Sequence, residues 1–202
     1  MLGKFITFEG GDGAGKSTQI QLLAQYLETK GIEYIITREP GGGKMSEEIR
    51  QLLLNKKDTN CVNDCEALLI AAARVQHVHD IILPSLKANK VILCDRYVHS
   101  TFAYQGYGRG MDLDFLKAIN MPAMEQVMPD ITFLLHIHPS DAFARKNKRV
   151  ALDRIEQAGI AFHERVYNGY LKLAKEDEKI ISIDANLPVS SIHASILQAL
   201  KI

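Results

Sequence analysis

The chain has no excess charge of either sign, because its 24 lysines and arginines balance its 24 aspartates and glutamates. This balance gives no general basic surface, so we expect no nucleic-acid partner. No apolar run is long enough to span a membrane, and the first residues lack the apolar segment and cleavage site of a signal peptide. The sequence therefore predicts a cytoplasmic protein without a membrane partner.

Cysteine is also scarce. Cys61, Cys65 and Cys94 form an odd, sparse set, which suits a reducing compartment better than a disulfide framework. We expect no metal site at the first two, because no second pair of soft ligands is near them. The chain has no internal repeat and no shift in composition, and 47% of its 202 residues are apolar. We therefore predict a single domain over residues 1–202 with one core.

What the chain does contain is a glycine-rich motif. Residues 10–17 match the phosphate-binding pattern G-x-x-x-x-G-K-[ST], with Gly10, Gly15, Lys16 and Ser17 at its fixed positions. Glycines let the backbone turn tightly and direct N–H groups inward, and the helix that follows adds its positive dipole end. We expect Lys16 to reach the β- and γ-phosphates of a nucleoside triphosphate and Ser17 to hold Mg²⁺. The predicted loop comprises Gly10, Gly11, Asp12, Gly13, Ala14, Gly15, Lys16, Ser17 and Thr18.

The flanking residues support this interpretation. Residues 4–9 alternate in polarity and are rich in strand formers, and residues 17–27 form a helical pattern with Ile20, Leu23 and Leu27 on one stripe. A glycine-rich turn without a ligand is the alternative, and the strand–loop–helix setting argues against it.

Further strands and helices alternate along the chain. We predict strands at residues 33–37, 90–95, 129–138 and 179–184, and helices at 46–54, 64–83, about 157–175 and 188–200. Pro84 is expected to end the second of these helices, and residues 97–110 are expected to form a polar and aromatic loop rather than core. The alternation predicts an α/β fold with a five-stranded parallel sheet and helices on both faces.

Charged residues follow two of the expected strands. Ligands of parallel sheets bind beyond the carboxyl ends of the strands, so Arg38 is placed to meet an anion. Asp95 ends a continuous apolar run and is the natural carboxylate for the Mg²⁺ shell, and Arg96 can pair bidentately with a phosphate. Arg74 follows three alanines, which leave room for a ligand. A solvated arginine is the alternative for Arg38 and Arg74.

A basic segment lies in the second half of the chain. Arg145, Lys146, Lys148 and Arg149 fall within five residues, and an acidic and basic stretch follows at 153–156. Such a run is usually a solvated face. In a phosphoryl transferase, however, a mobile basic segment can close over the nucleotide, exclude water and stabilise the transferred charge. We predict a lid at about residues 140–156.

Together, these motifs resemble the thymidylate kinase family. The segments that carry the resemblance are, in order, FEG at 8–10, DGAGKS at 12–17, TREPGG at 37–42, AARVQ at 72–76, DRY at 95–97, AYQG at 103–106, GRG at 108–110 and LDRIE at 152–156. The resemblance implies a three-layer P-loop NTPase fold. It also implies transfer of the ATP γ-phosphate to dTMP, with Mg²⁺, in the synthesis of dTTP.

The resemblance also implies residue roles. Asp12 would lie near the acceptor sugar, Arg38 and Arg96 would hold its phosphate, Arg74 and Thr101 would face thymine, and Tyr104 would disfavour a ribose 2′-hydroxyl. The implied acceptor set comprises Asp12, Arg38, Glu39, Pro40, Ile70, Arg74, Arg96, Ser100, Thr101, Tyr104 and Gln105. The catalytic candidates are Lys16, Arg96, Arg145 and Arg149. The two lid arginines, Arg145 and Arg149, are included because Gly13 lacks a cation that some members carry in the phosphate loop, and the lid must then supply it.

Ile70 departs from the family pattern. It stands where the family usually has a phenylalanine that stacks on thymine, and it offers apolar contact without a π-face. We therefore expect a weaker or looser base site. The likeness further suggests a homodimer through apolar helices such as the one that carries Leu68 and Leu69, although a monomer's core would show the same pattern.

Other functions remain open. A P-loop kinase for another nucleoside monophosphate or for a deoxynucleoside would share the phosphate loop. A nucleotide-binding regulatory module without transfer activity is a second alternative, and Asp95, Arg96 and the basic lid argue against it. Turnover of a panel of acceptors separates these functions.

Overall fold

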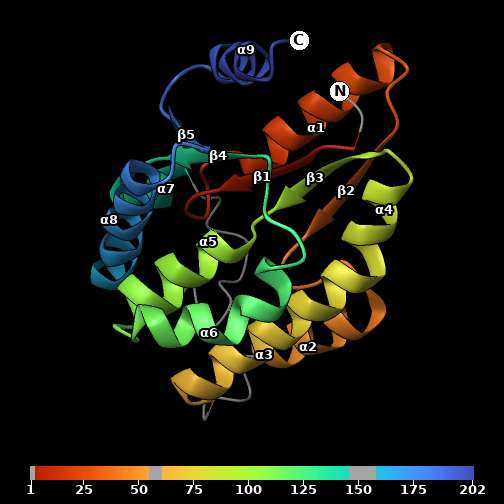
Figure 1. Cartoon of the computed structure of the whole chain (residues 1–202). Coiled ribbons are helices and arrows are strands. Elements are labelled where there is room, and N and C mark those ends of the chain that lie inside the picture. The colour runs from red at the N-terminus through yellow and green to blue at the C-terminus, as the bar shows by residue number, and fades with distance from the viewer. Residues whose placement is uncertain (1–2, 55–60, 146–157) are drawn as a thin grey trace.

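The computed structural model describes residues 3–54, 61–145 and 158–202. Within these ranges the strands are β1 (Phe5–Glu9), β2 (Tyr34–Arg38), β3 (Val91–Asp95), β4 (Ile131–His136) and β5 (Ile180–Asp184). Every pairing between them is parallel, and their order across the sheet is β2-β3-β1-β4-β5. The predicted five-stranded parallel sheet is confirmed, and Figure 1 shows its strands side by side.

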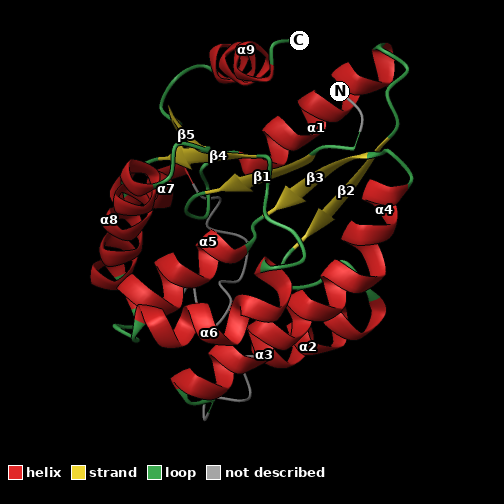
Figure 2. Ribbon diagram, viewed as in Figure 1, coloured by secondary structure: helices red, strands yellow, loops and turns green. Residues whose placement is uncertain are grey.

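Helices lie on both sides of this sheet, α1 and α9 above it and α2, α3 and α6 below it in the view of Figure 2. The α-helices are α1 (Lys16–Thr29), α2 (Lys44–Leu54), α3 (Asn63–His77), α4 (Leu83–Lys87), α5 (Val98–Thr101), α6 (Leu113–Met124), α7 (Pro139–Arg145), α8 (Ile160–Glu176) and α9 (Val189–Leu200). Two π-helical segments are η1 (Val78–Ile82) and η2 (Phe102–Gly108). None of the helices in the described ranges has the length and apolar character that crossing a membrane requires.

The alternation of side chains along β1 explains the layers. Ile6 and Phe8 pack in one cluster with Leu23 of α1 and Ile196 of α9. Phe5, which points to the other face, belongs to the cluster formed with α3, η1, α5 and α6. Successive strand residues face opposite sides, and these residues are fully buried, so both faces of the sheet need a covering layer of helices.

The prediction that Pro84 ends its helix is wrong. The chain continues from α3 through η1 into α4, where Pro84 occupies the first turn. In η1 the N–H of Leu83 donates to the carbonyl of Val78, five residues earlier. This wider turn precedes the proline, and a proline near the start of a helix removes no required hydrogen bond.

The prediction of a loop at residues 97–110 is also wrong. Residues 98–108 of this range form α5 and η2, and most of the range is buried. The glycines there serve close packing rather than turning: a Cβ on Gly106 would lie 2.5 Å from Leu113, and one on Gly108 would lie 2.7 Å from Phe162. The polar side chains of this segment pair with buried partners from other elements, as described below.

Candidate active site

The phosphate loop forms the predicted turn between β1 and α1. Gly10 has φ of 129°, and a Cβ there would lie 2.2 Å from the Leu135 carbonyl oxygen, so no other residue fits. Lys16, at the start of α1, is folded back over the loop, and its Nζ donates to the carbonyls of Gly10 at 3.2 Å and Gly11 at 3.1 Å. The loop is therefore pre-formed, with its lysine held at the centre.

The environment of Lys16 prepares it for an anion. Burial, followed by the nearby charge of Arg96, lowers the pKa of Lys16. Asp95 lies 4.0 Å from Nζ and opposes that shift. Phosphate oxygens bound in the loop would add negative charge beside the ammonium and so stabilise its charged form.

Gly13 lies where the loop approaches α7. Its φ is 81°, and a Cβ at this position would lie 3.1 Å from the Ala142 carbonyl oxygen. A longer side chain would be strained here by the backbone conformation and would press on α7. The structure thus gives a local reason why this position carries no cation.

Arg96 occupies a strained backbone position directly after β3. Its φ of 73° is in the left-handed region, which non-glycine residues rarely adopt and which is typical of functional sites. The turn directs the side chain across the phosphate loop, where Nη2 pairs with Asp12 Oδ1 at 2.7 Å and Nη1 donates to the Gly10 carbonyl at 2.9 Å. Arg96 is therefore fixed between the loop and the helices below it.

A buried carboxylate beneath Arg96 organises this region. Glu9, the last residue of β1, accepts from the Tyr97 N–H at 2.7 Å, from the Ser100 hydroxyl at 2.5 Å and from the Tyr170 hydroxyl at 2.8 Å. Tyr170 in turn lies 3.2 Å from Arg96 Nη1, and burial raises the pKa of its hydroxyl, which stays protonated and able to donate. Sequence reasoning assigned no role to Glu9 or Tyr170, because their pairing joins residues 161 positions apart.

A cavity, here called the inner cavity, opens beside Arg96. Its lining comprises Asp12, Glu39, Pro40, Arg50, Leu54, Ile70, Arg74, Arg96, Tyr97, Ser100, Thr101, Tyr104 and Gln105. Ten of these residues belong to the predicted acceptor set, which has eleven members, so the fold brings nearly the whole set together. Arg50, Leu54 and Tyr97 were missed. Arg50 lies on a predicted helix, where the sequence pattern alone does not distinguish it from a surface arginine.

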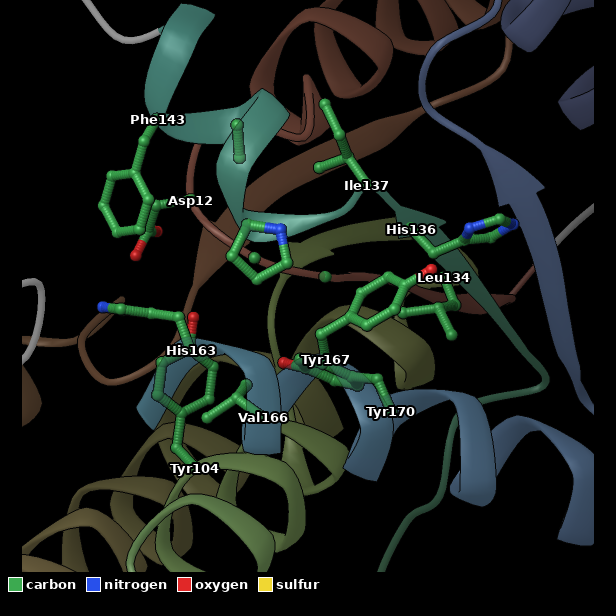
Figure 3. A pocket seen from close by; sticks show the side chains of 14 residues that line it. Asp12, Tyr104, Leu134, His136, Ile137, Phe143, His163, Val166, Tyr167 and Tyr170 are labelled. Atoms are coloured by element: carbon green, nitrogen blue, oxygen red, sulfur yellow. The ribbon is translucent and has the colours of Figure 1, made fainter. Parts of the chain in front are cut away.

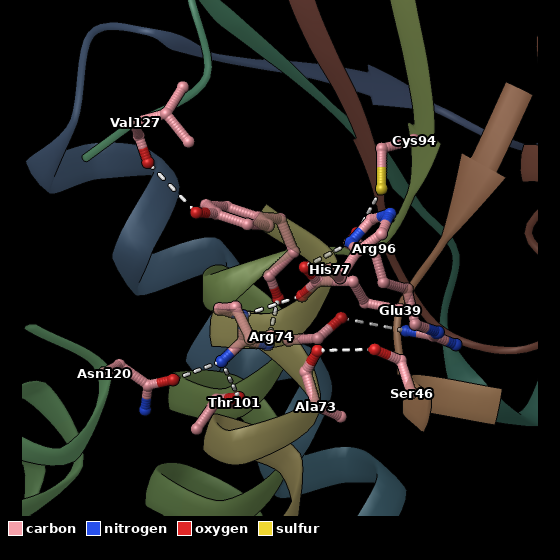
Figure 4. Close-up of polar contacts among 12 residues, drawn as sticks. Glu39, Ser46, Ala73, Arg74, His77, Cys94, Arg96, Thr101, Asn120 and Val127 are labelled. Carbon is pink, nitrogen blue, oxygen red and sulfur yellow. Dashed lines mark hydrogen bonds and ion pairs between the residues drawn. The ribbon is translucent and has the colours of Figure 1, made fainter. Parts of the chain in front are cut away.

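Arg74 is held by partners from several elements at the inner cavity (Figure 4). It is 2% exposed, and its Nε pairs with Glu39 Oε2 at 2.7 Å. Its Nη1 donates to the Thr101 hydroxyl at 3.0 Å and to the Asn120 side-chain oxygen, and its Nη2 donates to the Tyr97 carbonyl at 3.2 Å. The alternative of a solvated Arg74 is excluded, since a buried guanidinium needs such partners.

A second cavity, here called the loop cavity, lies over the phosphate loop. It is lined by Asp12, Gly13, Gly15, Lys16, Ser17, Thr18, Arg38, Glu39, Arg50, Asp95 and Arg96. Four residues, Asp12, Glu39, Arg50 and Arg96, line both this cavity and the inner cavity. The two spaces therefore meet at a pair of arginines, and two anionic groups bound one in each would face each other there.

The other predicted site residues lie around these two cavities or beneath the phosphate loop. Arg38 lines the loop cavity but not the inner cavity, and it pairs with Glu47 at 3.0 Å. Ala14 belongs to the core beneath the loop. Gly10 and Gly11 border a third cavity, between the loop, the end of β4, α7 and α8 (Figure 3). Its other lining residues are Asp12, Tyr104, Leu134, His136, Ile137, Pro139, Ala142, Phe143, His163, Val166, Tyr167 and Tyr170.

The predicted lid is described only in part. Arg145, at the end of α7, donates from Nη1 to the Ala185 carbonyl and from Nη2 to the Asn186 side-chain oxygen, both at 2.8 Å. It thus contacts the turn after β5 and lines neither the loop cavity nor the inner cavity. Arg149 and the rest of the lid, residues 146–156, lie outside the described residues.

Comparison with known proteins identifies the family that carries this site. The profile of the family described as thymidylate kinase matches residues 8–196. This chain belongs to the thymidylate kinase family. A thymidylate kinase from Exiguobacterium sibiricum is 46% identical over 197 residues, 97% of this chain and 93% of the relative. One from a Geobacillus strain is 44% identical over 202 residues, 98% and 96% of the two chains.

The fold agrees with that of a solved family member. The crystal structure of thymidylate kinase from Ehrlichia chaffeensis superposes on this chain with a TM-score of 0.79 and 35% sequence identity, and the match covers 98% of each chain. The three-layer P-loop NTPase fold that the resemblance implied is thereby confirmed.

Proposed function

We propose that this thymidylate kinase family member transfers the γ-phosphate of ATP to dTMP, giving dTDP and ADP, as a step in dTTP synthesis. The observation that carries the proposal is the meeting of the loop cavity and the inner cavity at Asp12, Glu39, Arg50 and Arg96. A triphosphate in the phosphate loop and a monophosphate in the inner cavity would face each other there. The enzyme then needs no covalent intermediate, only alignment of two nucleotides and stabilisation of charge.

The cations at this junction have separable roles. Lys16 holds the transferred phosphoryl group from the donor side, and Arg96 bridges the donor and acceptor phosphates. The lid supplies a further cation from Arg149, or from Arg145 once it leaves its contacts with Ala185 and Asn186. Arg38 binds the acceptor phosphate from the loop cavity that it lines. In the inner cavity Arg74, Thr101 and Gln105 face the base. Tyr104 borders the part of the inner cavity that would hold the acceptor sugar, and it disfavours a ribose 2′-hydroxyl there.

A panel of acceptors tests the proposed function. With ATP as the donor, dTMP should give far more ADP than dCMP, AMP or the deoxynucleosides in a coupled assay. Turnover of dTMP no greater than that of dCMP or AMP would favour a kinase for another nucleoside monophosphate, and turnover of deoxynucleosides alone would favour a deoxynucleoside kinase. Binding of ATP without any turnover would leave the regulatory module as the function.

We propose Mg²⁺ as the cofactor, held by Ser17 and Asp95. Asp95 Oδ1 is buried and has no hydrogen-bond partner in the described part of the chain, although Lys16 lies 4.0 Å away. Ser17 lines the same cavity. The Ser17 hydroxyl and the Asp95 carboxylate oxygen, beside a phosphate loop, suit a hard cation that prefers oxygen ligands. The ion would neutralise phosphate charge when it is bound.

Asp95→Asn should raise the Mg²⁺ concentration needed for half-maximal activity by at least about tenfold, since the amide carries no charge for the cation shell. The measurement is activity against free Mg²⁺ at saturating ATP and dTMP. Asp114→Asn, which changes an exposed carboxylate on α6, is the matched control. An unchanged Mg²⁺ requirement in Asp95→Asn would exclude this residue from the shell.

Ile70→Phe should lower the KM for dTMP about threefold to tenfold, because an aromatic ring adds a stacking contact of about 0.5–1.5 kcal/mol. Ile70 lines the inner cavity and is 7% exposed. Ile70→Leu, which keeps the size without a ring, should leave the KM close to that of the parent. A KM that rises or stays constant in the phenylalanine variant would contradict the looser base site.

We further propose a single domain over residues 1–202, active as a homodimer in the cytoplasm. Leu68 on α3 supports an intermolecular role for this helix, since half of its surface is exposed while its neighbour Ala67 is fully buried. None of the three cysteines forms a disulfide in the described part of the chain, which suits a reducing compartment. Sedimentation of the parent and of Leu68→Glu measures the association, and the variant should be monomeric.

A further inference from the structure

A buried carboxylate lies beside the inner cavity, away from the phosphate region. Glu66 on α3 has 0% exposed surface. Arg109 reaches both of its oxygens, with Nε donating to Oε1 at 3.3 Å and Nη2 to Oε2 at 3.1 Å. The guanidinium also lies over the Phe162 ring, 5.1 Å from its centroid. Arg109 thus compensates a charge that would be costly to bury alone.

The same carboxylate determines which way the amide of Gln105 faces. Gln105 in η2 is 3% exposed, and its Nε2 donates to Glu66 Oε1 at 2.8 Å. An ionised carboxylate only accepts hydrogen bonds, so the amide turns its nitrogen towards Glu66 and its oxygen away. Since Gln105 lines the inner cavity, its Oε1 is the polar atom that it offers to a ligand there.

Arg74 offers the complementary group on the same cavity wall. Its contacts with Glu39, Thr101, Asn120 and the Tyr97 carbonyl in the described part of the chain use four of its five N–H donors. One N–H of Nη2 is left for a ligand. The cavity therefore presents one fixed acceptor, from Gln105, and one fixed donor, from Arg74.

We propose that Glu66 is a positioning residue for base selection. It holds the Gln105 amide so that Oε1 accepts from N3–H of thymine, while Arg74 donates to O4. Cytosine presents an acceptor at N3 and a donor at the neighbouring amino group. Its acceptor would therefore face the Gln105 oxygen, and its donor would face the Arg74 N–H, so neither hydrogen bond could form. This inference rests on the proposed function and adds to it the residue that sets the preference for dTMP over dCMP.

Glu66→Gln tests the inference. The substituted amide can either donate or accept, so it no longer dictates the orientation of the Gln105 amide. The ratio of kcat/KM for dTMP to that for dCMP should fall at least about tenfold, the scale of one hydrogen bond in a buried site. The change should be in KM, with kcat for saturating dTMP within about twofold of the parent, because Glu66 lies away from the reacting phosphates.

Two further variants separate positioning from mere stability. Arg109→Lys keeps the Glu66 carboxylate and a cation but loses the two-point pairing, so it should lower the melting temperature and preserve the dTMP/dCMP ratio. In a Gln105→Met background, Glu66→Gln should change the ratio by less than about twofold, since the amide through which Glu66 acts is gone. If Glu66→Gln gives too little folded protein, Glu66→Gln with Arg109→Gln removes the pair without leaving a partly buried guanidinium unpaired.

Each outcome decides between the two proposals. A parent enzyme that phosphorylates dTMP no better than dCMP overturns the proposed function and this inference with it. A parent that prefers dTMP, combined with a Glu66→Gln variant of unchanged ratio, overturns the inference alone. Equal losses with both acceptors, or an undiminished effect in the Gln105→Met background, also overturn it.

Discussion

Lys16→Met should reduce kcat for dTDP formation about 10²- to 10³-fold, the loss typical of removing one electrostatic donor from a pre-organised site. Lys16 is 7% exposed and is held over the phosphate loop by the carbonyls of Gly10 and Gly11. Methionine has a similar length and no charge. The fold should be retained, since an apolar side chain is buried here more readily than an ammonium.

The same variant should leave dTMP binding nearly unchanged, because Lys16 lines the loop cavity and not the inner cavity. The measurements are single-turnover kinetics, calorimetric affinity for dTMP and thermal melting. Lys87→Met, an exposed lysine on α4, is the matched control and should behave as the parent. A Lys16→Met enzyme that keeps more than a tenth of the parental kcat would overturn the role of this lysine.

Arg96→Lys should lower kcat/KM for dTMP about 10²-fold, although it keeps the positive charge. The guanidinium contacts several groups at once: Nη1 reaches the Gly10 carbonyl, Ser100 and Tyr170, while Nη2 reaches Asp12 and Tyr104. An ammonium is a single point charge on a flexible stem and cannot reproduce this fork. The φ of 73° further limits how the substituted side chain can be aimed.

The kinetic pattern distinguishes Arg96 from Lys16. Arg96 lines both cavities, so its replacement should raise the KM for dTMP as well as lower kcat. Initial-rate kinetics with both nucleotides varied measure the two constants. Arg165→Lys, which changes an exposed arginine on α8, is the control. A loss confined to kcat, with an unchanged KM for dTMP, would remove Arg96 from the acceptor site.

Much of the fold could be predicted from local patterns. Strand alternation, the apolar stripe on α1 and the glycine spacing of residues 10–17 depend on near neighbours in the chain, and a parallel sheet follows from strands that alternate with helices. Residues at strand ends or directly after them, such as Arg38, Asp95 and Arg96, were placed near the ligand edge because parallel strands end on the same side. Arg74 and Thr101 were predicted together for a different reason, the resemblance to a family, and the structure joins them by a hydrogen bond.

Residues 97–110 show where local patterns misled. Their glycines and polar side chains are typical of a loop, yet Gly106 and Gly108 are packing positions, and the polar groups are satisfied by Glu9, Arg74 and Glu66 from distant elements. These partners lie far away in the sequence, so a pattern read from neighbouring residues could not include them. Arg50 was missed for a similar reason, because it resembles any helical surface arginine until α2 is packed beside the inner cavity.

The sequence by itself determined the phosphate loop, the order of strands and helices, and the family. These depend on residue types at fixed short spacings, which survive without knowledge of the packing. Only the tertiary structure decided how the site is held: the left-handed turn that aims Arg96, the Glu9 and Tyr170 contacts beneath it, and the Glu66 carboxylate that orients Gln105. The physical reason is that a buried polar group must find its partner in space, wherever along the chain that partner comes from.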